Sequence, residues 1–265
     1  MRRPFLIRIA PTPLKVRLVH RLYLKQSDRW PDLFNGASLH FLPRIKMTLC
    51  PTDISHKYIA LAGYCELDLT RRILYHARTG GLLVDVGANY GYYSLLWAAS
   101  KSTNKSIAFE ASPRAFKGLA NNVKTNDLET QIQKVSLAVG KSVGTSWFAP
   151  GPADQTSWGG ITFENSESRM EVAVTTLDAY FSAREPIDVL KIDVEGADSW
   201  VLQGAEQLLS KKLVKHIYFE QNKVRMKKLG ISEEEALTFL NRLDYWVKPM
   251  NDIGSHLVEY VAGPK

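Results

Sequence analysis

Short apolar runs alternate with amphipathic stretches from residue 82 to residue 243, and this alternation predicts strands followed by helices. The first run, Leu82–Val86, passes through glycines into an apolar helix at Tyr92–Ser100. The other predicted strands are Ser106–Glu110, Ile132–Val139, Val189–Asp193 and His216–Glu220. The other predicted helices are 67–79, 113–126, 177–181, 197–209 and 233–243. This order is typical of a mostly parallel sheet covered by helices on both faces.

Two later segments depart from the alternation. Residues 146–176 contain Pro150-Gly151-Pro152 and Gly159-Gly160 among polar residues, which predicts an excursion or a β-hairpin near the mouth of the site. Near the end of the sequence, Tyr245–Pro249 and His256–Val261 predict an antiparallel pair that closes the sheet.

The first 27 residues show leucines that recur every four residues among basic side chains. These leucines are Leu14, Leu18 and Leu22. Residues 13–25 are therefore predicted to form a basic amphipathic helix. Such a helix can pack on the domain, make weak contact with an anionic membrane surface, or belong to a transit peptide, although a transit peptide should be richer in serine and threonine. Packing is the preferred interpretation, because basic amphipathic patterns are weak signals.

Length and composition favour one large domain that follows this helix. With 265 residues, 45% of them hydrophobic, the chain can bury a core without disulfides or metals. We divide it into a basic N-terminal extension, residues 1–40, and a domain over residues 41–265. Within the domain, an approach segment (41–81) leads to the core (82–265). No apolar run reaches the roughly 20 residues of a membrane span.

The net charge of +7 is located in the extension. Residues 1–27 contain seven of the 34 Lys and Arg residues and no acid, so the remaining 27 basic residues equal the 27 Asp and Glu residues. The body of the protein is formally neutral, which argues against a basic groove for nucleic acid. Cys50 and Cys65 lack metal-ligand spacing, and we expect them to be reduced thiols in a cytoplasmic protein.

The turn after the first strand indicates which ligand to expect. A dinucleotide fingerprint, G-x-G-x-x-G, would need glycine at Asn89 and Tyr92, whereas the turn reads D-x-G-x-x-x-G from Asp85 to Gly91. Glu110 ends the second predicted strand, where a carboxylate can bind both hydroxyls of a ribose. A ribose clamp without a pyrophosphate turn fits S-adenosylmethionine, which has a ribose and no phosphate.

Two motifs, in order, resemble those of the FkbM-type S-adenosylmethionine-dependent methyltransferases. The first is V-D-V-G-A-N-Y-G-Y-Y at 84–93, and the second is L-K-I-D-V-E-G-A-D at 190–198, followed by V-L-Q-G-A at 201–205. The family usually has Glu where Asp198 stands. The resemblance covers about residues 45–262. It implies an α/β, Rossmann-like class I methyltransferase fold: a mostly parallel seven-stranded sheet with helices on both faces and one antiparallel strand.

The resemblance also implies methyl transfer from S-adenosylmethionine, usually to an oxygen of a small molecule or sugar. It places a set of residues at the cofactor: Glu66 near the methionine amine, Asp85 at the loop or the amino end, Gly87, Ala88, Asn89 and Gly91 in the turn, Glu110 at the ribose, and Asp193. Glu66 is assigned through Gly63-Tyr64-Cys65-Glu66, which resembles the family's approach segment less closely.

An acceptor hydroxyl must lose its proton, either to a general base or with the help of a metal ion that lowers its pKa. Ligands of such sheets bind beyond the carboxyl ends of the strands, which makes Asp193, Glu195 and Glu220 the candidate catalytic residues. As structural residues, Asp193 would bind loop amides and Glu195 would balance Lys191. A Mg²⁺ ion held by Asp193, Glu220 and Asn222 is the less favoured alternative, so no metal ligand is assigned.

Other side chains are secondary candidates. Trp147, Phe148 and Trp158 flank the excursion, where they can stack on a sugar or pack the hairpin. His216 begins a strand and is expected at the opposite end of the sheet, whereas His56, in the approach segment, is the histidine to test.

The sequence therefore predicts an O-methyltransferase that acts on a hydroxyl of a sugar, glycan or other small molecule. Three alternatives stay open: a nicotinamide oxidoreductase, which the glycine spacing disfavours; an RNA-binding or RNA-modifying protein that uses the basic leader; and a cofactor-binding domain without catalysis. No nucleic-acid partner is expected, because the body is neutral and Ile192–Ala197 lacks the N-P-P-Y type of motif.

Overall fold

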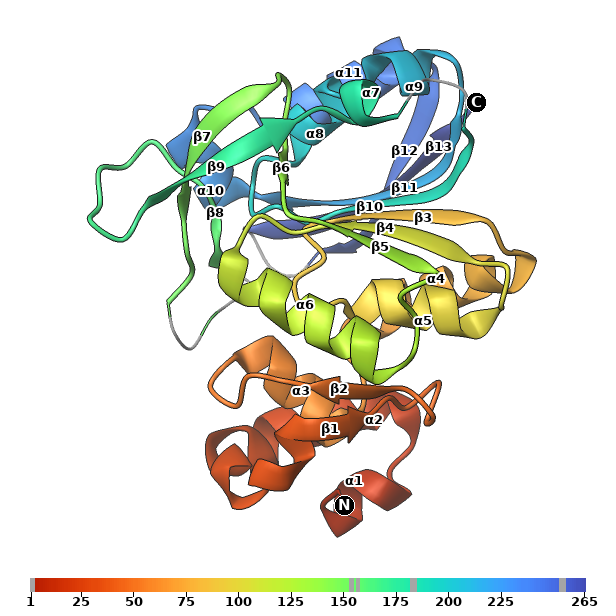
Figure 1. The fold of residues 1–265 in the computed structure, drawn as a ribbon, viewed down its shortest axis with the longest axis vertical. Helices are drawn as coiled ribbons and strands as arrows, with labels where there is room; N and C mark the ends of the chain where they lie inside the picture. The colour runs from red at the N-terminus through yellow and green to blue at the C-terminus, as the bar shows by residue number, and fades with distance from the viewer. Residues whose placement is uncertain (1–2, 153–154, 156–157, 182–184, 253–255) are drawn as a thin grey trace.

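The computed structural model of the chain describes residues 3–152, 155, 158–181, 185–252 and 256–265. Its centre is a seven-stranded sheet in the order β12-β13-β11-β10-β3-β4-β5 (Figure 1). The strands are β3 (Leu82–Val86), β4 (Lys105–Phe109), β5 (Ile132–Val135), β10 (Ile187–Ile192), β11 (Val214–Asn222), β12 (Tyr245–Asp252) and β13 (Leu257–Pro264). β13 runs antiparallel to both neighbours, and the other adjacent pairs are parallel. The predicted fold class is confirmed.

Helices cover both faces of this sheet, as the alternation of elements predicts (Figure 1). One face carries α4 (Leu67–Thr79), α5 (Tyr92–Ser100) and α6 (Pro113–Thr125); the other carries α7 (Leu177–Tyr180), α8 (Asp198–Gln203), α9 (Glu206–Ser210) and α11 (Glu235–Arg242). Two apolar cores result, one around Leu83, Leu95 and Leu119 and the other around Val84 and Leu190. Adjacent residues of β3 thus serve opposite faces, as the two-residue period of a strand requires.

A second, four-stranded sheet carries the excursion. Its order is β6-β9-β7-β8, with β6 (Ala138–Val139), β7 (Gly144–Ala149), β8 (Gly160–Ile161) and β9 (Met170–Thr175). The prediction of one continuous strand over 132–139 is wrong, because the chain leaves the central sheet after Val135 and pairs Ala138 with Val174 of the second sheet. This change of partner brings the excursion over the ends of the central strands.

Residues 3–62 form an N-terminal lobe below the helices of the central sheet (Figure 1). It contains α1 (Phe5–Ile9), α2 (Thr12–Leu18), a π-helical turn (Val19–Tyr23), 3-10 turns at Leu24–Arg29 and Pro31–Phe34, β1 (Asn35–Ser38), β2 (Lys46–Thr48) and α3 (Ile54–Ala62). The leucine stripe is not its packed face, since Leu14 and Leu22 are exposed while Val19 is fully buried. In the described residues, no helix is long and apolar enough to cross a membrane.

Two helical predictions need correction. The helix predicted over 197–209 is divided at Gly204, where a Cβ would lie 2.1 Å from the carbonyl oxygen of Gly140. Ser232-Glu233-Glu234-Glu235 has the sequence of a capping box, which predicts a helix start there. The box does not form, because the Glu235 carboxylate accepts hydrogen bonds from Ser199 and Gln203 of α8 instead. An additional helix, α10 (Lys223–Leu229), follows β11 directly and was not predicted.

Candidate active site

The glycine turn links the carboxyl ends of three central strands. The amides of Gly87 and Ala88 donate to the carbonyl oxygen of Phe109 at the end of β4, at 3.0 and 2.9 Å. Gly87 has φ +75°, and a Cβ there would lie 1.9 Å from the carbonyl oxygen of Asp193 after β10. Only glycine allows this approach. The turn therefore lies where the resemblance places the cofactor.

Glu110 follows β4 and is held by the backbone of the same turn. Its two carboxylate oxygens accept from the amides of Asn89 and Ser112, each at 2.7 Å. Its side chain is buried, and burial raises its pKa to about 7, against the effect of these two hydrogen bonds. Asn89 Oδ1 is buried and has no hydrogen-bond partner among the described residues. The turn thus offers an unpartnered acceptor beside a nearly enclosed carboxylate.

Lys191 lies beneath the turn and connects it to two acids. Its ammonium is 3.5 Å from Asp85, which is opposite it in the β3–β10 register, and 3.3 Å from Asp193; it also donates to the carbonyl oxygen of Gly87 at 3.1 Å. Burial alone would lower the pKa of Lys191, but the carboxylates of Asp193, Asp85 and Glu66 raise it overall. Lys191 is therefore a buried cation, and it was considered from the sequence only as a counter-charge for Glu195.

The structure places Asp85 under the turn and not in its cavity. The Asp85 side chain is fully buried and accepts from Ser94 Oγ at 2.7 Å. Gly91 is likewise structural, since it precedes α5 with φ +86° and a Cβ there would lie 2.6 Å from Leu119. By contrast, Gly87, Ala88 and Asn89 line the cavity described next.

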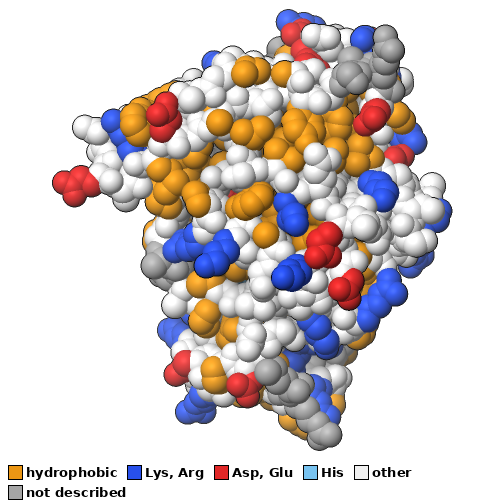
Figure 2. Space-filling model, viewed as in Figure 1, with side chains coloured by type: hydrophobic (Ala, Val, Ile, Leu, Met, Phe, Trp, Pro, Cys, Tyr) orange, Lys and Arg blue, Asp and Glu red, His pale blue; other side chains and the backbone are white. Residues whose placement is uncertain are grey.

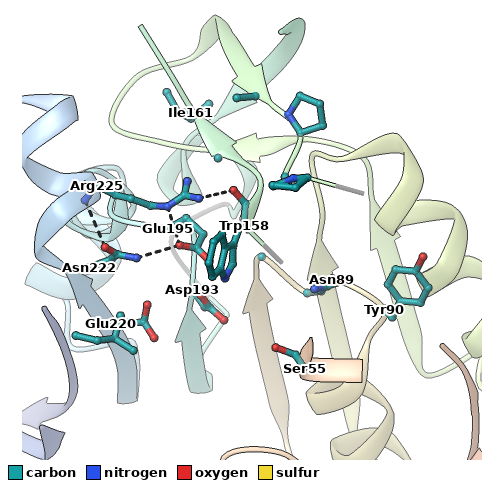
Figure 3. A pocket seen from close by; sticks show the side chains of 18 of the residues that line it. Ser55, Asn89, Tyr90, Trp158, Ile161, Asp193, Glu195, Glu220, Asn222 and Arg225 are labelled. Carbon is teal, nitrogen blue, oxygen red and sulfur yellow. Dashed lines mark hydrogen bonds and ion pairs between the residues drawn. The ribbon is translucent and has the colours of Figure 1, made fainter. Parts of the chain in front are cut away.

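A cavity of about 840 Å³ opens beyond the strand ends (Figure 3). Glu66, Asp193, Glu195 and Glu220 line it, together with residues of α3, α10 and the excursion. A narrower cavity beside it is lined by Glu110 and by apolar residues that include Phe109, Val139 and Phe148. The two cavities share Gly87, Asn89, Gly160, Ile161 and Asp193. Asp193 therefore stands where the two spaces meet.

The acids of the large cavity differ in their environments. Burial raises the pKa of Glu66 to about 7, with a further increase from the Asp193 charge; Tyr93 donates a hydrogen bond to its carboxylate. Water can reach Glu66 from the cavity, although protein surrounds it on its other sides. Burial, and next the charge of Asp193, also raises the pKa of Glu220. Burial and the nearby charge of Asp193 thus both favour the protonated forms of Glu66 and Glu220.

Glu195 belongs to a separate hydrogen-bonded group whose members come from four segments of the chain (Figure 3). Its carboxylate is 3.2 Å from Arg225 Nε and accepts from Asn222 Nδ2 at 3.2 Å, while Arg225 also donates to the carbonyl oxygen of Trp158 at 2.6 Å. Glu195 has φ +57°, an uncommon backbone conformation for a residue other than glycine. Arg225 was missed because helix α10 was not predicted. The Trp158 ring projects toward Asp193 and Glu195 (Figure 3).

The remaining candidates are placed as follows. His56 is buried in the wall of the large cavity, where its ring packs on Tyr90 at 4.3 Å and its Nδ1 accepts from the Cys50 amide. His216 stacks on His76 at 4.0 Å near the start of β11, at the opposite end of the sheet, as predicted. In the described part of the chain, no three His, Cys, Asp or Glu side chains are placed to hold a metal ion. The Mg²⁺ alternative has no support.

Comparison with known proteins gives the family. The model of the methyltransferase FkbM domain matches residues 85–247, more than half of the chain. The chain belongs to the FkbM methyltransferase family. This confirms the resemblance carried by the motifs at Asp85–Gly91 and Asp193–Gly196, both of which lie in the matched region and at the cavities.

Other relatives of this FkbM-family chain are more distant. Methyltransferase sdnD of Sordaria araneosa is 27% identical over 160 residues, which are 47% of this chain and 60% of that protein. Precorrin-6y C5,15-methyltransferase of Geobacter metallireducens is 11% identical over 75% of this chain and 88% of its own, with a TM-score of 0.46. An rRNA methylase of Streptococcus thermophilus is 12% identical over 74% of this chain and 94% of its own, also with a TM-score of 0.46. Similarity at this level says nothing about the acceptor.

Proposed function

We propose that this FkbM-family chain transfers a methyl group from S-adenosylmethionine to a hydroxyl oxygen of a sugar, glycan or other small molecule. The observation that carries the proposal is the junction of the two cavities at Gly87, Asn89 and Asp193. A donor on one side and an acceptor on the other would meet there. A cavity of about 840 Å³ is within the range of roughly 300–1,000 Å³ that is usual for small-molecule sites.

The residues around the narrower cavity, which has a volume of about 60 Å³, offer contacts for the adenosine part of the donor, which would also have to extend into the larger cavity across their junction. Glu110 offers carboxylate oxygens to ribose hydroxyls, and it is held in place by the amides of Asn89 and Ser112. The buried, unpartnered Oδ1 of Asn89 offers a further acceptor, since a buried polar atom gains most from a ligand that donates to it. Apolar side chains of Val139 and Phe148 provide a surface for a flat base.

The residues of the larger cavity fit the methionine end and the acceptor. Glu66 faces this space and can accept hydrogen bonds from an ammonium group. The Trp158 ring, Asn222 and Arg225 line the outer wall, where an aromatic face and polar groups suit a hydroxylated acceptor.

S-adenosylmethionine, when bound, supplies a methyl group on a sulfonium that an oxygen can attack in line. The protein's part is to orient the acceptor and to remove its proton. Asp193 suits this task because it lies at the junction, is 38% exposed, and is held by the Lys191 ammonium. Glu220 suits it less, since its raised pKa favours the protonated form, and Glu195 is engaged with Arg225.

Calorimetry with S-adenosylhomocysteine and with NAD tests the cofactor assignment. We expect binding of the former in the micromolar range and no binding of NAD; the opposite preference would refute the proposal. Transfer of a labelled methyl group to sugars, polyols and amines then tests the acceptor. The methyl group should appear on oxygen, and a product methylated only on nitrogen would contradict the hydroxyl assignment.

Asp193→Asn separates chemistry from binding. Loss of a general base reduces turnover by about 10²–10⁴-fold, while binding of S-adenosylhomocysteine should change little, because the amide side chain has nearly the same shape as the carboxylate it replaces. Glu195→Gln is the comparison within the same motif, and it should act mainly through the KM for the acceptor. Full turnover in Asp193→Asn would remove Asp193 from the mechanism.

A further inference from the structure

The N-terminal lobe leaves large apolar side chains in solvent. Phe5, Leu6 and Ile9 of α1 are 66%, 43% and 63% exposed, and Leu14 and Leu22 are 44% and 42% exposed. α1 lies at the end of the molecule opposite the central sheet (Figure 1). Single exposed apolar residues are ordinary, but a group within 18 consecutive positions (5–22) of one lobe needs an explanation.

Basic side chains accompany these apolar residues. Arg8, Arg17, Arg21 and Lys25 are all exposed, and residues 1–27 contain no acid. Within the described ranges, none of these four side chains forms an ion pair or a side-chain hydrogen bond. At this end of the molecule Figure 2 shows basic and hydrophobic side chains, with some acidic ones among them.

Other cations of the same lobe are used by its fold. Arg3 donates to the carbonyl oxygens of Ala60 and Ser38, and Lys15 is buried beside His40, with Nζ 3.4 Å from His40 Nδ1. Ile7 and Val19 are fully buried in the same core. The lobe therefore turns one set of basic and apolar side chains inward and leaves a second set outward. The prediction that the helix of the basic N-terminal extension packs on the domain accounts for the first set alone.

We propose that the second set, defined as Phe5, Leu6, Arg8, Ile9, Leu14, Arg17, Arg21, Leu22 and Lys25, is a docking surface for an anionic phospholipid bilayer. Lysine and arginine side chains attract acidic headgroups, and neighbouring apolar side chains enter the boundary between headgroups and acyl chains. The surface contacts the membrane without spanning it. It is separate from the cavities, since no member of the set lines them.

The combination of side chains favours lipid over nucleic acid. RNA phosphates would neutralise Arg17 and Arg21 but would leave Phe5 and Ile9 in water, and nucleic-acid sites add aromatic stacking platforms at basic grooves. A bilayer with acidic headgroups accommodates both kinds of side chain in one interface. The attraction should weaken with salt, because the charged side chains are exposed to solvent.

Co-sedimentation with extruded vesicles tests this surface in the full chain. Vesicles of phosphatidylcholine with 30% phosphatidylserine should bind the protein. Vesicles of phosphatidylcholine alone should bind it on the order of 1,000-fold more weakly, because the attraction of all four basic side chains is lost. Arg17→Gln with Arg21→Gln should lower the partition coefficient on the order of 30-fold, and Phe5→Ser with Ile9→Ser at least about 10-fold. Lys211→Gln with Lys227→Gln, which removes the same charge from exposed positions outside the lobe, should leave binding unchanged.

Each variant also needs unchanged circular dichroism and unchanged S-adenosylhomocysteine affinity, so that the loss is assigned to the surface and not to unfolding. Equal binding to both vesicle types, or equal loss in the lysine control, would overturn the proposal. So would RNA binding through Arg17 and Arg21 that exceeds vesicle binding at the same salt. A concentration-dependent dimer that Phe5→Ser with Ile9→Ser abolishes would assign the surface to a second copy of the chain instead.

Discussion

Lys191 Nζ lies 3.3 Å from Asp193 Oδ2, and this contact joins the buried centre of the sheet to the junction of the two cavities. The same ammonium reaches Asp85 and the carbonyl oxygen of Gly87. One cation therefore supports both the glycine turn and the proposed base. A buried cation is tolerated only with such partners, because its desolvation is otherwise too costly.

Lys191→Met should destabilise the protein strongly. It leaves the fully buried Asp85 with Ser94 as its remaining partner and no counter-charge, and loss of one member of a buried ion pair costs about 3–5 kcal/mol. The free energy of unfolding in urea measures this. Lys215→Met is the matched control, since it breaks an exposed pair with Asp188 and should cost less than about 1 kcal/mol. Equal costs in the two variants would contradict the role of Lys191.

Gly87→Ala should abolish cofactor binding. The new Cβ would lie 1.9 Å from the Asp193 carbonyl oxygen, so the turn and the end of β10 cannot both keep their positions. Gly36→Ala provides the comparison, because Gly36 also has a left-handed φ, +99°, but nothing lies within 4 Å of its Cβ position. It should cost only the conformational strain of about 1–2 kcal/mol. Calorimetry with S-adenosylhomocysteine decides, and normal affinity in Gly87→Ala would show that the turn is not at the cofactor.

Local pattern was sufficient for most of the central sheet. β3, α5 and α6 begin and end within a residue or so of the predicted positions, because apolar period, glycine and the Ser112 N-cap are local signals. The prediction of one strand over 132–139 was wrong for a non-local reason: Val135 pairs with β4, whereas Ala138 pairs with β9. Residues far along the chain decide that change, so no local pattern contains it.

The residues of the candidate active site also divide into those that local sequence signals reveal and those that depend on contacts between distant parts of the chain. Glu110 and Asp193 could be placed from the sequence, since both follow predicted strands at the edge where ligands bind. Lys191 could not be recognised as the centre of the site, because its contact with Asp85 depends on the parallel register of β3 and β10. This register places Asp85 opposite Lys191, which is 106 positions later in the chain. Arg225 could not be found without α10. Pairings across the sheet, not residue types, determine these contacts.

The stability of the protein should depend on pH through Asp198. Burial, and next the Asp193 charge, raises the Asp198 pKa from about 3.8 to about 7. The neutral side chain therefore contributes stability that is complete below pH 3.8 and is lost as the pH rises through 7. Asp198→Asn cannot ionise, so its free energy of unfolding relative to wild type should increase between pH 4 and pH 8, by on the order of 1.4 kcal/mol per unit of pKa shift.

Urea unfolding across this range, with Asp68→Asn at an exposed position of α4 as control, measures the difference. The control should run parallel to wild type. A constant difference between Asp198→Asn and wild type at all pH values would mean that Asp198 does not titrate between pH 4 and 8 in the folded protein.

Trp158→Ala should weaken acceptor binding and leave the cofactor unaffected. Trp158 is 51% exposed, lines the large cavity and projects toward Asp193 and Glu195 (Figure 3), so its ring can stack on an acceptor. Loss of one aromatic contact is worth about 0.5–1.5 kcal/mol, which corresponds to a KM increase of about 2–12-fold. Trp147→Ala is the matched control: Trp147 is 42% exposed, but its ring packs on Arg169 and lies outside the cavity lining. The best acceptor from the labelled-methyl screen serves as substrate. If both variants raise KM equally, the effect belongs to the excursion as a whole, and Trp158 has no direct contact with the acceptor.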